Sequence, residues 1–290
     1  MGNKFNDLPD IQSTTPEIKL PLKQVGVQNL QVPFMLESKF GGYNDMVAKV
    51  SIKTSLSSSV RGISMSRLLL TLNEFLRKPL KHFLIETILE AIAEALKTDY
   101  ASIKFEFKLP IMKMSEISLN SFPLYYDCKF DGHFWKAVPK GELNFRFFQG
   151  VTVQYASYCP CSVELCKDLE EKGEQGFPHA QRSFAEVLVE TRDPNYVWLE
   201  DIIELVEKAV KVVPYPIIKR VDEQEIARIA SKNPMFVEDA IRAICKTLRT
   251  KPDIYDWIVK CTHEESIHTS EAIAINWKGV SNGFDEKYYI

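Results

Sequence analysis

Hydrophobic positions recur with two different periods along the chain, and each period predicts one kind of element. Alternation of apolar and polar residues predicts strands, as in Leu30, Val32 and Phe34. Apolar residues at spacings of three and four predict amphipathic helices, as in Leu68, Leu72 and Phe75. The predicted strands cover residues 30–37, 46–54, 101–109, 118–130, 142–158, 183–191, 254–261 and 271–277, and the predicted helices 65–76, 80–96, 197–212 and 233–248.

The order of these elements is duplicated. Two strands, two helices and two strands occur once in each half of the chain, with Pro139-Lys140-Gly141 between the halves. This pattern is typical of an α+β protein whose antiparallel sheets are each covered by a helix pair. We therefore expect two ββααββ modules, residues 1–138 with an extended N-terminal arm and residues 139–290.

Composition and charge narrow the class of protein. Of 290 residues, 45% are hydrophobic and 26% charged, which excludes a disordered or fibrous chain. A net charge of -3 gives no strong field for nucleic acid or an anionic membrane. The sequence has neither an N-terminal signal-like apolar run nor a membrane-spanning one. We expect a cytoplasmic protein whose six cysteines are reduced.

Two of these cysteines form a Cys-Pro-Cys sequence at the end of a predicted strand. Cys159 and Cys161 are followed by His179 at the start of the next strand. A thiolate and an imidazole suit zinc or iron. The spacing lacks the second Cys-x-x-Cys pair of a zinc finger and favours three protein ligands with a position left for water. The alternative is a pair of buried cysteines and a surface histidine.

Three further groups of polar residues could carry chemistry. Glu223 and Glu238 could bind a ligand, or could simply be acids at a solvated helix end, where they favour the helix dipole. His263 and His268 fall in an expected polar loop and could transfer protons, or be ordinary surface residues. Arg67 follows a stretch that either caps a helix or binds an anion.

Taken together and in order, several sequence motifs resemble the type IB GTP cyclohydrolases of the tunnelling-fold (T-fold) superfamily. The resemblance covers nearly the whole chain. The motifs are Pro9-Asp10-Ile11-Gln12, Val25-Gly26-Val27, Met65-Ser66-Arg67, Ser157-Tyr158-Cys159-Pro160-Cys161-Ser162, His179-Ala180-Gln181-Arg182-Ser183, Lys219-Arg220 with Asp222-Glu223, Asn233-Pro234 with Phe236-Val237-Glu238-Asp239, and Glu265-Ser266-Ile267-His268.

The resemblance implies a bimodular T-fold and a homo-oligomer, expected to be a tetramer, with active sites at subunit interfaces. It implies one divalent ion per site (Zn, Mn or Fe), held by Cys159, His179 and Glu223. Such an ion lowers the pKa of bound water, which in this family attacks C8 of GTP. Formate is released and a 7,8-dihydroneopterin phosphate forms.

The resemblance also implies roles for residues beyond the metal ligands. Cys159 and His268 match catalytic positions, the histidine as a proton shuttle. Glu238 matches the anchor of the purine, because one carboxylate can accept two parallel N–H bonds. The candidates for the triphosphate are Arg67, Arg182, Lys219 and Arg220.

The sequence departs from the family pattern at three places. Ser64 and Ser270 stand where family members usually carry histidines, and the segment between the Cys-Pro-Cys motif and His179 is longer than usual. Two alternatives therefore stay open. One is a nitrile reductase of queuosine synthesis, which needs NADPH and a cysteine thioimide. The other is a purine- or pterin-binding protein without catalysis.

Overall fold

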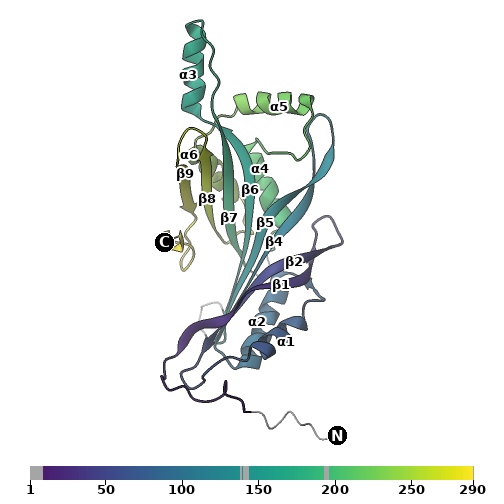
Figure 1. Cartoon of the computed structure of the whole chain (residues 1–290), viewed down its shortest axis with the longest axis vertical. Helices are drawn as coiled ribbons and strands as arrows, with labels where there is room; N and C mark the ends of the chain where they lie inside the picture. The colour runs from purple at the N-terminus through teal and green to yellow at the C-terminus, as the bar shows by residue number, and fades with distance from the viewer. Residues whose placement is uncertain (1–8, 138, 140–143, 193–195, 290) are drawn as a thin grey trace. The chain divides into compact units, whose positions relative to one another are not determined.

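A computed structural model describes residues 9–137, 139, 144–192 and 196–289. It contains a nine-stranded sheet with the order β3-β1-β2-β4-β5-β6-β7-β8-β9 and six α-helices among the described residues (Figure 1). Contacts divide the chain into two compact units, which share strands of the sheet. Unit 1 comprises residues 1–107 and 130–147, and unit 2 residues 108–129 and 148–290. The α+β class expected from the sequence is confirmed, whereas the module boundary at residue 138 stays a prediction.

Unit 1 places two helices on its part of the sheet. Leu84, Ile88 and Ile92 of α2 are buried, as its helical periodicity predicts. A Cβ atom at Gly132 would lie 2.4 Å from the Ile85 side chain, so glycine is required where α2 meets the sheet. The elements are β1 (Leu22–Glu37), β2 (Tyr43–Leu56), α1 (Met65–Asn73), β3 (Pro79–Leu80), α2 (His82–Leu96), and the unit 1 parts of β4 (Tyr100–Met114), β5 (Ser121–Trp135) and β6 (Phe145–Tyr158).

Unit 2 repeats this layering with different helices. α4 (Leu199–Val210) and α6 (Val237–Leu248) lie on one face of the sheet (Figure 1). Both bury an apolar stripe, which includes Ile203 and Ile244, and Trp257 of the sheet is fully buried. The strands of this unit are most of β6, then β7 (Ala180–Thr191), β8 (Asp256–Glu265) and β9 (Glu271–Trp277), of which β7–β8 and β8–β9 pair antiparallel.

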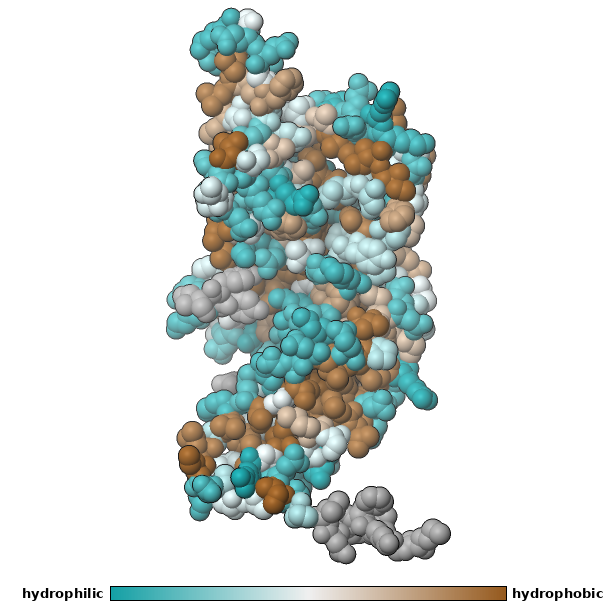
Figure 2. All heavy atoms as spheres, in the orientation of Figure 1, coloured by the Kyte–Doolittle hydropathy of each residue, from teal (hydrophilic) through white to brown (hydrophobic). Residues whose placement is uncertain are grey.

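Two helices of unit 2 are absent from the predicted ββααββ order, which is therefore wrong for this half. α3 (Pro160–Glu171) buries none of its residues, and Figure 2 shows hydrophilic and hydrophobic residues side by side on the surface at its place in Figure 1. α5 (Arg220–Ser231) buries only Asp222 and Ala230. Hydrophobic periodicity arises from packing on a core, so helices that bury almost nothing do not produce it.

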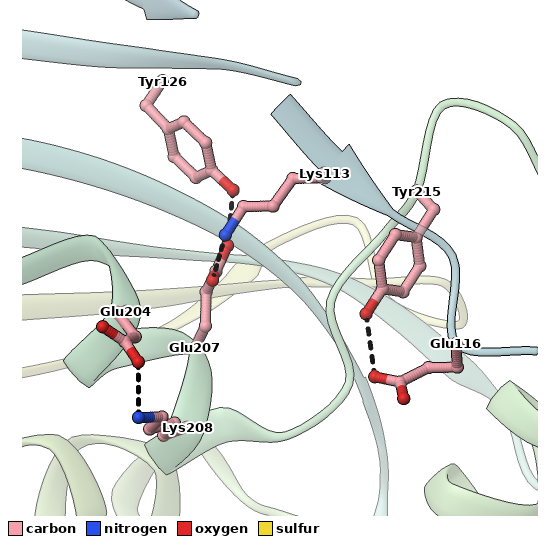
Figure 3. A network of polar contacts seen from close by, with 7 residues as sticks. All are labelled: Lys113, Glu116, Tyr126, Glu204, Glu207, Lys208 and Tyr215. Atoms are coloured by element: carbon pink, nitrogen blue, oxygen red, sulfur yellow. Dashed lines mark hydrogen bonds and ion pairs between the residues drawn. The ribbon is translucent and has the colours of Figure 1, made fainter. Parts of the chain in front are cut away.

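Polar side chains attach the β4–β5 hairpin to α4 within unit 2. Lys113 Nζ lies 2.5 Å from the Glu207 carboxylate, and the Tyr126 hydroxyl donates to the same group (Figure 3). Burial, together with Glu207, raises the pKa of Tyr126. The Tyr215 hydroxyl donates to Glu116 at 3.1 Å (Figure 3). Because the contacts to Glu207 are partly withdrawn from water, they fix the hairpin better than exposed ion pairs would.

Among the described residues, no helix is both long and apolar enough to cross a membrane.

Candidate functional site

The Cys-Pro-Cys segment turns from a strand into a helix. Cys159 directly follows β6 and is the N-cap residue of α3, with Pro160 in the first turn, a position that suits proline because it needs no N–H donor. Cys159 is half-buried and Cys161 is exposed, and both are free thiols. The motif thus presents two thiols at one end of the unit 2 sheet.

A backbone hydrogen bond brings a second motif to the same place. The Met235 N–H donates to the Tyr158 carbonyl at 3.1 Å. It joins the residue before Cys159 to the segment that begins α6, where Phe236 is the N-cap residue and Glu238 lies in the first turn. Seventy-five residues of sequence separate these motifs, and this contact places them side by side.

An open apolar groove of about 530 Å³ lies between these two helix starts. It is lined by Pro160, Cys161, Glu164, Leu165 and Phe236. The volume falls in the range of about 300–1,000 Å³ that is usual for small-molecule sites. Two lining residues, Cys161 and Phe236, belong to the motifs that contain the predicted metal ligand Cys159 and the predicted purine anchor Glu238.

His179 lies against the first turn of α3. Its backbone N–H donates to Ser162 Oγ at 3.2 Å. Its Nδ1 atom is buried without a hydrogen-bond partner, and lies 3.7 Å from a Glu265 carboxylate oxygen. His179 and Glu265 side chains are only 14% and 15% exposed. An orphaned ring nitrogen beside a carboxylate is an arrangement suited to a metal-binding histidine.

Behind His179, buried polar side chains form a continuous network on the helix-covered face of the sheet. Ser157 Oγ donates to Gln181 Oε1 at 2.7 Å and lies 2.9 Å from Ser183 Oγ. Gln181 Nε2 donates to Glu265 Oε1. The network continues to His263, whose Nδ1 lies 3.4 Å from Ser157 Oγ. These partners satisfy groups that would otherwise be costly to bury.

His263 belongs to β8 and is buried, so the expectation of a loop histidine was wrong for this residue. Its Nε2 lies 2.9 Å from the Tyr155 hydroxyl oxygen. Burial lowers the pKa of His263 from 6.5 to about 4, although the charges of Glu265 and Glu238 favour the protonated ring. A neutral imidazole in this network is a fixed hydrogen-bonding group rather than an exposed acid or base.

The three predicted metal ligands belong to different segments of unit 2. A thiol and an imidazole suit a divalent transition metal, and a carboxylate beside Nδ1 of His179 leaves the other ring nitrogen, Nε2, for that use. Glu223, however, starts α5 and is exposed. Within the described ranges, no cluster of three His, Cys, Asp or Glu residues could hold an ion. His179 lies against α3, of which Cys159 is the N-cap residue, whereas Glu223 lies on α5.

A neighbouring carboxylate fixes the first turn of α5. Asp222 is buried and accepts hydrogen bonds from the Ile117 and Ser118 N–H groups at 3.1 and 2.8 Å, and from Ser118 Oγ at 2.6 Å. It also caps the helix by accepting from the Lys219 N–H at 2.9 Å. The Ser118 hydroxyl and these N–H groups lower the pKa of Asp222. The position of Glu223 therefore depends on the hairpin loop.

The remaining predicted residues have separate positions. Lys219 is the N-cap residue of α5 and Arg220 its first residue. Arg182 is exposed and pairs in register with Glu264, so it points to the sheet face opposite Gln181 and Ser183. His268 is exposed in the turn after β8. Arg67 belongs to unit 1, where its guanidinium donates to the Ala95 carbonyl at 3.4 Å.

Sequence reasoning assigned no separate role to five residues of the buried network: Tyr155, Ser157, Gln181, Ser183 and Glu265. The alternation of inward and outward residues along β7 and β8 could have indicated them, since Gln181 pairs with Glu265 and Ser183 with His263. Polar residues at successive inward positions of two paired strands indicate a buried polar site, because isolated buried polar groups are disfavoured.

Solved structures with the same fold define the class. The crystal structure of uricase from Arthrobacter globiformis matches with a TM-score of 0.55 at 6% identity, over 94% of this chain and 99% of that one. A uricase from Bacillus fastidious matches with a TM-score of 0.54 at 8% identity, over 88% and 92% of the two chains. Such low identities show the fold alone, which is the tunnelling fold.

Sequence comparison defines the family. The protein-family model described as "Type I GTP cyclohydrolase folE2" matches residues 8–274, and the chain belongs to this family. It is 33% identical over 272 residues to GTP cyclohydrolase FolE2 of Thermotoga maritima, covering 94% of this chain and 98% of that protein. The FolE2 protein of Cereibacter sphaeroides strain ATCC 17029 is 31% identical over 277 residues, covering 94% and 76%.

Proposed function

We propose that the protein is a metal-dependent GTP cyclohydrolase of type IB, which hydrolyses GTP at C8, releases formate and forms a 7,8-dihydroneopterin phosphate. Its family membership supports the reaction. The observation that supports the proposal most directly is the groove between α3 and α6, whose lining residues Cys161 and Phe236 belong to the motifs that contain Cys159 and Glu238. We also propose that the protein is cytoplasmic and forms a homotetramer with active sites between subunits.

The groove would hold the purine between an apolar wall and an anchoring carboxylate. Phe236 is 39% exposed and lines the groove, so its ring is available to stack on a base. Glu238, two residues later on α6, would accept the guanine N1–H and the 2-amino group. Together they would orient C8 toward the Cys159 side of the site.

Cys159 and His179 would hold the divalent ion, with Glu223 as the third proposed ligand. When bound, the ion would lower the pKa of a coordinated water and so supply the nucleophile. For Glu223 to join the other two, α5 must move or the residue must come from a neighbouring subunit, since the described residues contain no three-residue cluster. His268 would carry protons during ring opening.

Four cations are proposed for the triphosphate: Arg67, Arg182, Lys219 and Arg220. Lys219 and Arg220 begin α5, where the helix dipole adds a favourable field for an anion. Arg182 is exposed on the outer sheet face. In this proposal the site is completed by assembly, which would bring these separate cations to one substrate.

The matched family and relatives give no support to the nitrile reductase of queuosine synthesis. One observation still favours the alternative, a purine-binding protein without catalysis: Ser64 and Ser270 replace histidines of the family pattern. Formate release from GTP with added Zn, Mn or Fe separates the two. GTP binding without formate, in metal-loaded protein, would contradict the proposed reaction.

A matched pair of cysteine variants sharpens this experiment. Cys159→Ala is expected to abolish both stoichiometric metal binding and formate release, because it removes the thiolate donor. Cys166→Ala is the control, since Cys166 is also a half-buried free thiol of α3. It is expected to keep both properties. Full metal binding by Cys159→Ala would remove this residue from the metal site.

A further inference from the structure

Gln181 and Glu265 lie directly opposite each other on paired strands. The register of β7 and β8 places them across the ladder, on the helix-covered face. Gln181 Nε2 donates to Glu265 Oε1, and Gln181 is 4% exposed. One oxygen of the Glu265 carboxylate is therefore engaged, and the second remains for another donor.

Ser157 fixes which way the Gln181 amide points. Its hydroxyl donates to Gln181 Oε1 at 2.7 Å. Because the amide oxygen is held on that side, the NH₂ group must face Glu265. Glu265 thus accepts a hydrogen bond from an amide whose orientation Ser157 fixes. This bond holds the Glu265 carboxylate in one orientation.

The second carboxylate oxygen faces His179. Glu265 Oε2 lies 3.7 Å from His179 Nδ1, the buried ring nitrogen that lacks a hydrogen-bond partner. A carboxylate can only accept, so it favours a proton on the nitrogen that faces it. In a neutral imidazole the other nitrogen, Nε2, then carries the free lone pair.

We propose that Glu265, oriented by Gln181, is a positioning residue that sets the tautomer of His179, with the proton on Nδ1 and the lone pair on Nε2. This role rests on the metal site proposed above, in which Nε2 would be the ligand atom. A carboxylate behind a ligating histidine typically contributes about 10–100-fold to metal affinity. None of the residues that bind GTP in the proposed function is needed for it.

Exchanging Glu265 for glutamine gives a sharp expectation. Ser157 keeps the Gln181 NH₂ facing position 265, so the new amide must turn its oxygen toward Gln181. Its NH₂ then faces His179 Nδ1, which has to accept. Glu265→Gln should therefore reverse the tautomer of His179 rather than merely loosen the ring.

The test is nitrogen NMR of metal-free protein labelled with ¹⁵N-histidine, recorded where the imidazoles are neutral, with His179→Ala to assign the signal. We expect an Nδ1–H tautomer in the unchanged protein, an Nε2–H tautomer in Glu265→Gln, and no change in Glu264→Gln. Glu264 is the control because it is an exposed neighbour on the opposite sheet face. An Nε2–H tautomer in the unchanged protein, or an unaltered signal in Glu265→Gln, would overturn the positioning role.

Zinc titration supplies the second readout. The Kd for Zn²⁺ is expected to rise about 10–100-fold in Glu265→Gln and to stay unchanged in Glu264→Gln. The two failures are distinguishable. A reversed tautomer in a protein that binds no zinc would overturn the metal site alone, whereas zinc binding with an unaltered tautomer would overturn the role of Glu265.

Discussion

The Met235 N–H donates to the Tyr158 carbonyl at 3.1 Å, and this bond sets the start of α6 beside the end of β6. Cys159 follows one partner and Glu238 lies three residues after the other. The motifs proposed to bind metal and purine, far apart in sequence, thus each contribute lining residues to one groove. The separate contributions of the two sides can be tested by substitutions that leave this backbone bond intact.

Glu238→Ala should weaken GTP binding and leave metal binding intact. Two charge-assisted hydrogen bonds to guanine would be lost, each contributing about 1.5–3 kcal/mol. The Kd for GTP, measured by calorimetry, should therefore rise by about 100-fold or more. Glu90→Ala, an exposed glutamate on α2, is the control. An unchanged Kd for GTP would remove Glu238 from the purine site.

Phe236→Leu tests stacking in the groove. Leucine keeps an apolar side chain but has no aromatic face, and base–aromatic stacking contributes about 1–3 kcal/mol. We expect the Kd for GTP to rise about 10-fold, with unchanged zinc stoichiometry. Phe177→Leu is the matched control, since Phe177 is 90% exposed and does not line the groove. Equal effects of the two substitutions would argue against a stacking role.

Asp222→Asn tests the attachment of α5 to the hairpin loop. The substitution removes the charge from the group that accepts from Ile117, Ser118 and Lys219. Hydrogen exchange at those three amides should accelerate, because charge-assisted hydrogen bonds become neutral ones. Asp253→Asn, an exposed aspartate, should leave them unchanged. Full protection in Asp222→Asn would show that another contact holds the loop.

His263 should make the free energy of unfolding depend on pH. The unfolded imidazole takes up a proton near pH 6.5, whereas burial delays this in the folded protein to about pH 4. Between these values the unfolded state binds more protons, so stability falls as the pH falls. The loss from this residue is about 3 kcal/mol and is complete below about pH 4.

Urea unfolding at a series of pH values measures this effect. His263→Asn, which has no group that titrates in this range, should flatten the dependence between pH 7 and pH 4 by about 3 kcal/mol. His133→Asn is the comparison, since His133 is only half-buried in unit 1. Parallel curves for the unchanged protein and His263→Asn would contradict the lowered pKa.

The sequence predicted the elements that bury an apolar face and missed those that do not. α6 was expected because residues such as Ala240 and Ile244 recur on one buried side. α3 buries nothing and α5 is held by the polar contacts of Asp222, so neither leaves an apolar stripe in the sequence. Helices stabilised by capping and local contacts are hard to recognise from periodicity.

In the candidate site, too, some residues could be predicted from the sequence and others could not. Motif resemblance pointed to Cys159, His179 and Glu238, of which Cys159 and Glu238 belong to motifs whose neighbouring residues line the groove. It gave no role to Gln181, whose importance comes from lying across the strand pair from Glu265. Strand register is set by tertiary pairing, so the sequence alone could not bring these two residues together.

The most direct measurement is mass spectrometry of the product made from GTP by Mn- or Fe-loaded protein under reducing conditions, with formate counted in parallel. The expected result is a 7,8-dihydroneopterin phosphate and one formate for each GTP consumed, both lost in Cys159→Ala. Unchanged GTP and no formate, from protein that carries metal and binds GTP, would contradict the proposed cyclohydrolase.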